Sequence, residues 1–365
     1  MLSHDACSHL RVSNFSDLLL TLAPPFAAAG VALARAGEAP AFHVAAAPGL
    51  RMTPDTLWRA ASLSKMVTAR TLEALGGEGV WAREASEALG VRLRHPRWPA
   101  APVTLGMLAS HQSGLTDAAG YAVPPERSLR DWLAEAGEGA WLPHPPGTFL
   151  HYCNLGFVLL AAVAERLGGE RFDLLARRHV LGPLGIEGGF AWSGVAPQRR
   201  QDRLPAFRRG PQGFAPQIDD AVAPDGLSDP DGAAPTLRPP GENPAPLSPQ
   251  GGLRLSLRGA LRLAESLAGE TPRRFWTPAM GPGDYGDGVL ESAGPGLLVF
   301  DNPAFHPRPL LGHFANAYGI LAGAWHDPLR GASFAYVLNG LPLGDEADGW
   351  RPEELAIFDA VARAL

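Results

Sequence analysis

The sequence predicts an α/β (α+β) fold with two lobes, because strand and helix patterns fall in different parts of the chain. Strand patterns lie near both ends, within residues 27–47 and 318–338, whereas the regular pattern between them is helical. Strands at both ends with helices between them predict an α/β lobe formed by residues 1–80 and 285–365. Residues 81–284 are then expected to form a mainly helical lobe.

The first half of the chain contains a predicted hairpin and two predicted helices. Residues 27–47 should form a β-hairpin around a turn at residues 36–38, although alanine is a poor strand former. A helix should begin at Ser62 and end at the glycines 76–77. Residues 155–167 are apolar on almost every side, so they predict an interior helix.

The second half begins with a stretch that differs from the rest. Residues 196–250 are dense in proline, glycine and aspartate, which predicts a long irregular excursion within the helical lobe. Helical spacing returns at residues 253–267. Residues 318–325 and 333–338 predict a second hairpin, and residues 353–365 an amphipathic terminal helix.

Composition excludes several function classes. The chain has 365 residues, 46% of them hydrophobic, which is enough for a large core. The formal net charge of -6 and the lack of basic clusters argue against a nucleic-acid or membrane-surface partner. Residues 1–30 lack a cationic start and the longest apolar run, residues 155–164, is too short to span a bilayer, so a cytoplasmic protein is expected. Two cysteines, Cys7 and Cys153, do not form a disulfide framework.

Lys65 is the only lysine of the chain, although lysine and arginine together number 31. An arginine does not deprotonate in proteins, whereas a buried lysine can release a proton. Ser62 lies three residues earlier, so helical spacing would place both side chains on one face. The pair therefore predicts a serine nucleophile and a lysine that moves its proton. An ordinary lysine on a helix surface remains the alternative at this point.

Four segments carry a family resemblance. DTLWRAASLSK (residues 55–65) is followed by LASHQSGL (108–115), PGTFLHYCNLG (146–156) and LGH (311–313), which precedes a predicted hairpin ending in LNG (338–340). In order and spacing they resemble the nucleophile segment, the LLSHTSGL stretch, the Tyr-x-Asn segment and the third motif of class C β-lactamases and their relatives. Those relatives include serine esterases, D-aminopeptidases and penicillin-binding-protein-like hydrolases. The resemblance implies a β-lactamase/transpeptidase-like fold, with an antiparallel sheet flanked by helices and a mainly helical lobe.

The resemblance also implies roles for particular residues. Tyr152 would share the general-acid and general-base work with Lys65, and which of the two takes the serine proton stays open. Asn154 would orient Lys65 and the acyl side chain of the substrate. The backbone N–H groups of Ser62 and Asn316 would form the oxyanion hole.

Other interpretations of the neighbouring residues accompany these roles. Without the resemblance, Tyr152 would be a half-buried core tyrosine and Asn154 a cap of the helix that begins near residue 155. We expect His111 to support the site by satisfying buried backbone groups, and Asp117 to be solvated.

The third motif departs from the lactamase pattern at three positions expected to bind substrate. Lactamases carry a lysine where His313 stands, a hydroxyl residue where Phe314 stands and a glycine where Ala315 stands. The hydroxyl and the amine hold the β-lactam carboxylate, so their loss predicts inefficient β-lactam turnover.

The sequence thus predicts a serine hydrolase that forms an acyl-enzyme on a small ester or amide, with no metal and no organic cofactor. A D-amino-acid peptidase or amidase, or an acyltransferase, is the alternative within catalysis. A non-catalytic binding relative is the alternative of another class. The motifs leave the natural substrate and the oligomeric state open.

Overall fold

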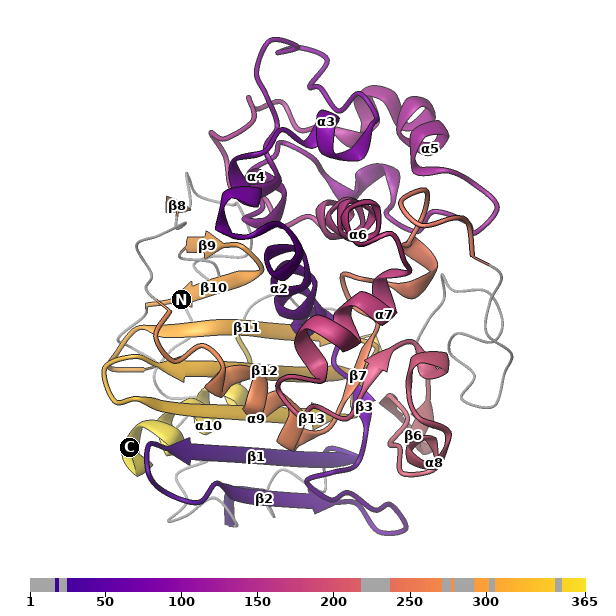
Figure 1. Cartoon of the computed structure of the whole chain (residues 1–365). Helices are drawn as coiled ribbons and strands as arrows, with labels where there is room; N and C mark the ends of the chain where they lie inside the picture. The colour runs from indigo at the N-terminus through magenta and orange to yellow at the C-terminus, as the bar shows by residue number, and fades with distance from the viewer. Residues whose placement is uncertain are drawn as a thin grey trace.

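The antiparallel sheet at the centre of the fold contains strands from both halves of the chain (Figure 1). The computed structural model describes residues 17–19, 25–217, 237–270, 277–278, 292–301, 306–344 and 350–365. The strand order is β2-β1-β13-β12-β11-β10-β9-β8, with antiparallel pairing throughout. Its strands are β1 (Ala28–Arg35), β2 (Ala41–Ala46), β8 (Thr277–Pro278), β9 (Ser292–Gly294), β10 (Leu297–Phe300), β11 (Leu310–Ala317), β12 (Ile320–Asp327) and β13 (Ala332–Asn339).

Both predicted hairpins are confirmed. β1 and β2 pair from Ala28 opposite Ala46 to Leu33 opposite Ala41. β12 and β13 pair along their whole lengths. β1 also pairs with β13, so its alanines form a strand that is buried between two neighbours, and this tertiary context outweighs their low strand propensity.

Helices cover both faces of the sheet. The terminal helix α10 (Pro352–Ala364) confirms the predicted helix at the end of the chain, and its Phe358 packs against Phe334 and Tyr336 on one face. On the other face, α9 (Leu257–Glu265) contacts β1, β12 and β13. A Ser256 cap, whose side chain accepts the Gly259 N–H, begins α9.

A group of helices lies away from the β1–β2 side of the sheet (Figure 1). α2 (Ser64–Gly76) packs against α6 (Leu155–Gly168), which is buried continuously from Leu155 to Glu165. The predicted interior helix is therefore confirmed. Within the parts of the chain that the structure describes, no helix is both long and apolar enough to cross a membrane.

Shorter elements complete this region. They are η2 (Ala61–Leu63), η3 (Glu78–Ala82), α3 (Ala85–Leu89), α4 (Leu105–Ala109), η4 (Asp117–Ala119), α5 (Leu129–Ala136), η5 (Gly137–Ala140), α7 (Phe172–Ala176), η6 (Arg177–Leu181), η7 (Trp192–Gly194), α8 (Pro197–Arg200) and η8 (Ala245–Leu247).

Two small sheets correct the expectations for the second half of the chain. The stretch predicted to be irregular contains a hairpin of β5 (Phe207–Gly210) and β6 (Gly213–Pro216), because β5 pairs with β14 (Leu341–Pro342) at the end of the main sheet. Residues 218–236 of that stretch lie outside the described residues.

The second small sheet has the order β3-β7-β4 and leads directly to the site. β7 (Leu253–Leu255) occupies the start of the segment predicted to be helical, because it pairs with β3 (Trp58–Arg59) on one side and β4 (Gly189–Phe190) on the other. The pairing fixes the chain just before Ser62.

Candidate functional site

Ser62 lies in η2, the tight turn that joins β3 to α2. The helix predicted to begin at Ser62 therefore begins two residues later. The preceding residue, Ala61, has a φ of 43° although it is not a glycine. Such left-handed backbone is uncommon for a residue with a side chain and recurs at functional sites. The turn places Ser62 in the lining of a cavity of about 240 Å³.

Lys65 is completely buried and makes hydrogen bonds to Ser62 and to two other residues. Its Nζ donates to Asn154 Oδ1 at 2.7 Å and to the Gln250 carbonyl at 2.9 Å. Neither oxygen has a proton to give, so these bonds use two N–H groups of the amine. The third contact is a donation from the charged ammonium to Ser62 Oγ at 3.1 Å, and it becomes the position of the lone pair once the amine is neutral. In that protonation state the serine hydroxyl donates to Lys65.

Burial lowers the pKa of Lys65 from its usual 10.5 to about 7, because a charged ammonium loses its hydration there. The Asp117 carboxylate acts in the opposite direction and raises this pKa. Desolvation is the larger effect, so a large neutral fraction exists near neutral pH. A lysine of this kind can accept a proton from a hydroxyl.

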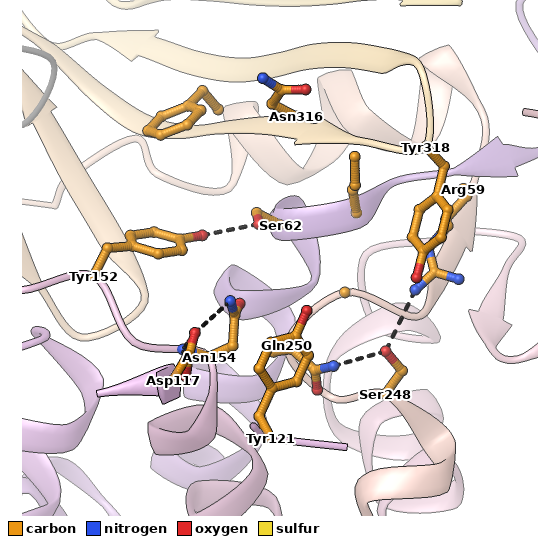
Figure 2. A pocket seen from close by; sticks show the side chains of 14 residues that line it. Arg59, Ser62, Asp117, Tyr121, Tyr152, Asn154, Ser248, Gln250, Asn316 and Tyr318 are labelled. Carbon is orange, nitrogen blue, oxygen red and sulfur yellow. Dashed lines mark hydrogen bonds between the residues drawn. The ribbon is translucent and has the colours of Figure 1, made fainter. Parts of the chain in front are cut away.

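Tyr152 approaches Ser62 from another side. Its hydroxyl donates to Ser62 Oγ at 2.8 Å (Figure 2). The centroid of its ring lies 4.7 Å from Lys65 Nζ. The ring stacks on His111 with centroids 4.4 Å apart. His111 Nδ1 accepts the Cys153 N–H at 3.1 Å, which agrees with the supporting role expected for this histidine. Burial holds the pKa of His111 well below its usual value, so the ring is neutral.

Asp117 is half-buried and bonded to the protein, rather than simply solvated as expected from the sequence. Its oxygens accept the backbone N–H groups of Asn154 and Leu155 at 2.9 to 3.0 Å, at the beginning of α6. This carboxylate, rather than the Asn154 side chain, therefore caps the helix. Asp117 also accepts Asn154 Nδ2 at 2.8 Å, which turns the amide oxygen of Asn154 toward Lys65.

β11 forms the opposite wall of the cavity and packs against η2. Phe314, expected to bind substrate, and Asn316, expected to contribute to the oxyanion hole, both line the cavity. His313 and Ala315 alternate with them along the strand and are completely buried behind this wall, because successive side chains of a strand point to opposite faces. The side chains of His313 and Ala315 therefore do not reach the cavity, contrary to the expectation that they bind substrate. Burial, followed by the nearby charge of Lys65, lowers the pKa of His313 to about 3.

The far side of the cavity contains residues that the sequence did not single out. Figure 2 shows Tyr152 to one side of Ser62 and a cluster of Arg59, Tyr318 and Ser248 to the other. The complete set not predicted from the sequence is Arg59, Ala61, Asp117, Tyr121, Ser248, Gln250, Gly251, Ala317 and Tyr318. Only the position of Arg59, three residues before Ser62, offered a hint.

The described residues contain no group of three or more His, Cys, Asp or Glu side chains that could hold a metal ion. The polar groups that line the cavity are hydroxyls, side-chain amides, the Arg59 guanidinium and the Asp117 carboxylate.

Comparisons with known proteins agree on one family. The family model described as Beta-lactamase matches residues 25–357. Penicillin-binding protein 4 of Amycolatopsis lactamdurans is 28% identical over 147 residues, and this match spans 38% of the chain and 37% of that protein's length.

Solved structures match over a larger share of the chain. D-amino acid amidase from Ochrobactrum anthropi SV3, complexed with L-phenylalanine amide, has a TM-score of 0.67 at 18% identity, covering 99% of this chain and 98% of that one. The β-lactamase/D-alanine carboxypeptidase from Yersinia pestis, complexed with citrate, has a TM-score of 0.67 at 16% identity, covering 95% and 97%. At these identities the likeness shows a shared fold.

Proposed function

Because the chain belongs to the β-lactamase family of serine hydrolases, we propose that it hydrolyses a small ester or amide through an acyl-enzyme on Ser62. The observation that carries this proposal is the bonding of Lys65. Two pure acceptors hold its N–H groups and leave its third position facing the serine hydroxyl. A lysine held this way is a base aimed at one oxygen.

In the first step, Lys65 takes the proton of Ser62 while the serine Oγ forms a bond to the substrate carbonyl carbon. Negative charge develops on the carbonyl oxygen, and the backbone N–H groups of Ser62 and Asn316 stabilise it. Preorganised donors of this kind contribute roughly 10²–10³ in rate. Support for this pair of donors comes from the packing of β11 against η2.

In the second step, the tetrahedral intermediate loses its leaving group. Tyr152 donates a proton to the departing oxygen or nitrogen and recovers one from Lys65, and both groups lie within hydrogen-bond distance of Ser62 Oγ. A water molecule then attacks the acyl-enzyme, Lys65 or Tyr152 accepts its proton, and Ser62 is released with its hydroxyl restored. Asn154, held by Asp117, keeps Lys65 in place throughout.

D-Amino acid amides are the second candidate substrate class. The similarity of the amidase from Ochrobactrum anthropi over nearly the whole chain is the reason to test D-amino acid amides as well as esters.

Covalent labelling tests the proposal. A fluorophosphonate should add one adduct to the protein by intact mass, and peptide mapping should place it on Ser62. Ser248 is the matched control, because its hydroxyl lies in the same cavity but accepts hydrogen bonds from Arg59 and Gln250. Ser62→Ala should lose both the adduct and the hydrolysis of p-nitrophenyl butyrate. An unlabelled Ser62, with hydrolysis unchanged in Ser62→Ala, would contradict the proposal and favour a binding protein.

A further inference from the structure

A second cavity lies among the helices, apart from the Ser62 cavity. It has a volume of about 350 Å³ and is lined by α3, α5, α6 and the segment 238–242. Figure 1 shows these three helices on the side of the molecule away from β1 and β2. No described residue lines both cavities. The volume suits a small organic ligand, since pockets for such ligands range upward from roughly 300 Å³.

The floor of the second cavity is part of the hydrophobic core. Leu89, Leu129 and Leu159 line it and are at most 3% exposed. Val91 and Leu133 also line it and pack, half-buried, against the same core. A ligand with an apolar group is favoured here, because covering this floor removes apolar surface from water.

Two arginines meet at the rim of the second cavity. The side chain of Arg166, on α6, lies over Gly241 and Gly90: a Cβ at Gly241 would clash with its Cγ, and a Cβ at Gly90 would stand 2.8 Å from its Nη2. Arg130, on α5, donates from its Nη2 to the Gly90 carbonyl at 2.7 Å. Both guanidinium groups therefore lie against Gly90.

The carboxylates of the rim are engaged elsewhere. Arg130 and Arg166 are exposed, and neither forms an ion pair within the part of the chain that the structure describes. Glu242 lines the cavity too, but its carboxylate pairs with Arg238 at 2.6 Å. The other carboxylate, that of Asp131, accepts a hydroxyl in the cap of α5 at 2.7 Å. Two like charges at one glycine repel each other, and a bound anion relieves that repulsion.

We propose that the second cavity is a binding site for a monocarboxylate with an apolar tail, such as a short fatty acid. Arg166 and Arg130 hold the carboxylate, because the planar donors of arginine match its two oxygens. The tail covers the leucines of the floor. This site does not depend on the chemistry proposed for Ser62.

Three ligands of equal chain length test the proposal on the unaltered protein. They are octanoate, 1-octanol and octylammonium, which present a negative, a neutral and a positive head on the same tail. By calorimetric titration, octanoate should bind at least about tenfold more tightly than either of the others, the size typical of charge-assisted hydrogen bonds. Absence of octanoate binding, or equal affinities for octanoate and 1-octanol, would overturn the proposal.

Variants of the rim and the floor locate the ligand. Arg166→Gln should weaken octanoate binding at least about tenfold, whereas Arg177→Gln should keep the wild-type affinity. Arg177 is the matched control, because it is also an exposed arginine, on η6, and does not line the cavity. Leu133→Phe, which fills part of the cavity, should weaken binding as well. Wild-type affinity in Arg166→Gln would contradict the assignment, and if that variant does not fold, Arg130→Gln decides in the same way.

Covalent labelling separates the second cavity from the site at Ser62. An acid is also a product of ester hydrolysis, so octanoate can bind at the active site too. Protein labelled on Ser62 with a fluorophosphonate should keep its affinity for octanoate, because the two cavities share no described residue. Loss of binding on labelling would assign octanoate to the Ser62 cavity and overturn the proposal. Binding that depends on Arg166, in a protein whose Ser62 takes no label, would refute the proposed function alone.

Discussion

The pH dependence of acylation follows from the pKa of one amine. Only neutral Lys65 can accept the serine proton, and its pKa is about 7. The neutral fraction is therefore about nine-tenths at a pH about one unit above this pKa and about one-tenth at a pH about one unit below it. Lowering the pH from about 8 to about 6 should reduce kcat/KM for a neutral ester about tenfold, and kcat/KM should reach a plateau above pH 8.

The two histidines next to the site do not produce this effect. The pKa of His111 lies well below its usual value and that of His313 is about 3, so both rings stay neutral across this range. The change in rate should therefore belong to Lys65. Lys65→Arg should lose about 10²–10⁴ in kcat/KM at every pH, because arginine does not give up its proton in a protein.

The assay uses p-nitrophenyl butyrate at the isosbestic wavelength of p-nitrophenol, so that ionisation of the product does not distort the rates. Thermal unfolding of each variant at each pH checks that the protein remains folded. A kcat/KM that is constant between about pH 6 and 8, or a midpoint above about pH 9, would refute the reasoning that burial makes Lys65 a base at neutral pH.

Three more predictions concern Asp117, Glu354 and Phe314. Asp117→Asn removes the negative charge that raises the pKa of Lys65, and it removes the carboxylate that orients Asn154. The midpoint of the rate profile should therefore move to lower pH, and kcat/KM should fall at least about tenfold. An unchanged midpoint would contradict this role of Asp117. Burial raises the pKa of Glu354 from 4.5 to about 7, so its favourable contribution to folding, complete below about pH 4.5, is lost as the pH rises through about 7. Glu354→Gln should flatten the fall of the melting temperature over that range, and an unaltered slope would be the contrary result. With an aromatic ring at Phe314 in place of a hydroxyl, nitrocefin should be hydrolysed at least about a hundredfold less efficiently than p-nitrophenyl butyrate, which parallel kinetics would check.

The sequence predicted the residues that lie around the serine better than those that hold them. Ser62, Lys65, Tyr152 and Asn154 were expected together, and the structure joins them in one chain of hydrogen bonds, from Tyr152 through Ser62 and Lys65 to Asn154. The lone lysine and the motif spacing made this possible, since both are visible in the order of residues. Asp117 was misjudged because its partners begin 36 residues later in the chain, and nothing in its own neighbourhood indicates that contact.

In the fold, too, elements with a local sequence signal were predicted and elements that depend on distant contacts were not. Hairpins and the interior helix could be predicted because their signals are local, as in the apolar run of α6. β7 was taken for part of a helix because three residues carry no distinct period, and only pairing with β3 and β4 makes them a strand. The same pairing positions Arg59, so this part of the cavity lining depends on contacts between distant segments.

A direct titration of Lys65 tests the central claim. Because the chain has a single lysine, lysine carrying carbon-13 at Cε gives one protein resonance, whose chemical shift follows the charge of this amine alone. In the folded protein the shift should change with a midpoint near 7. A midpoint near the ordinary value of 10.5 would mean that Lys65 stays charged at neutral pH, and would contradict its role as the base for Ser62.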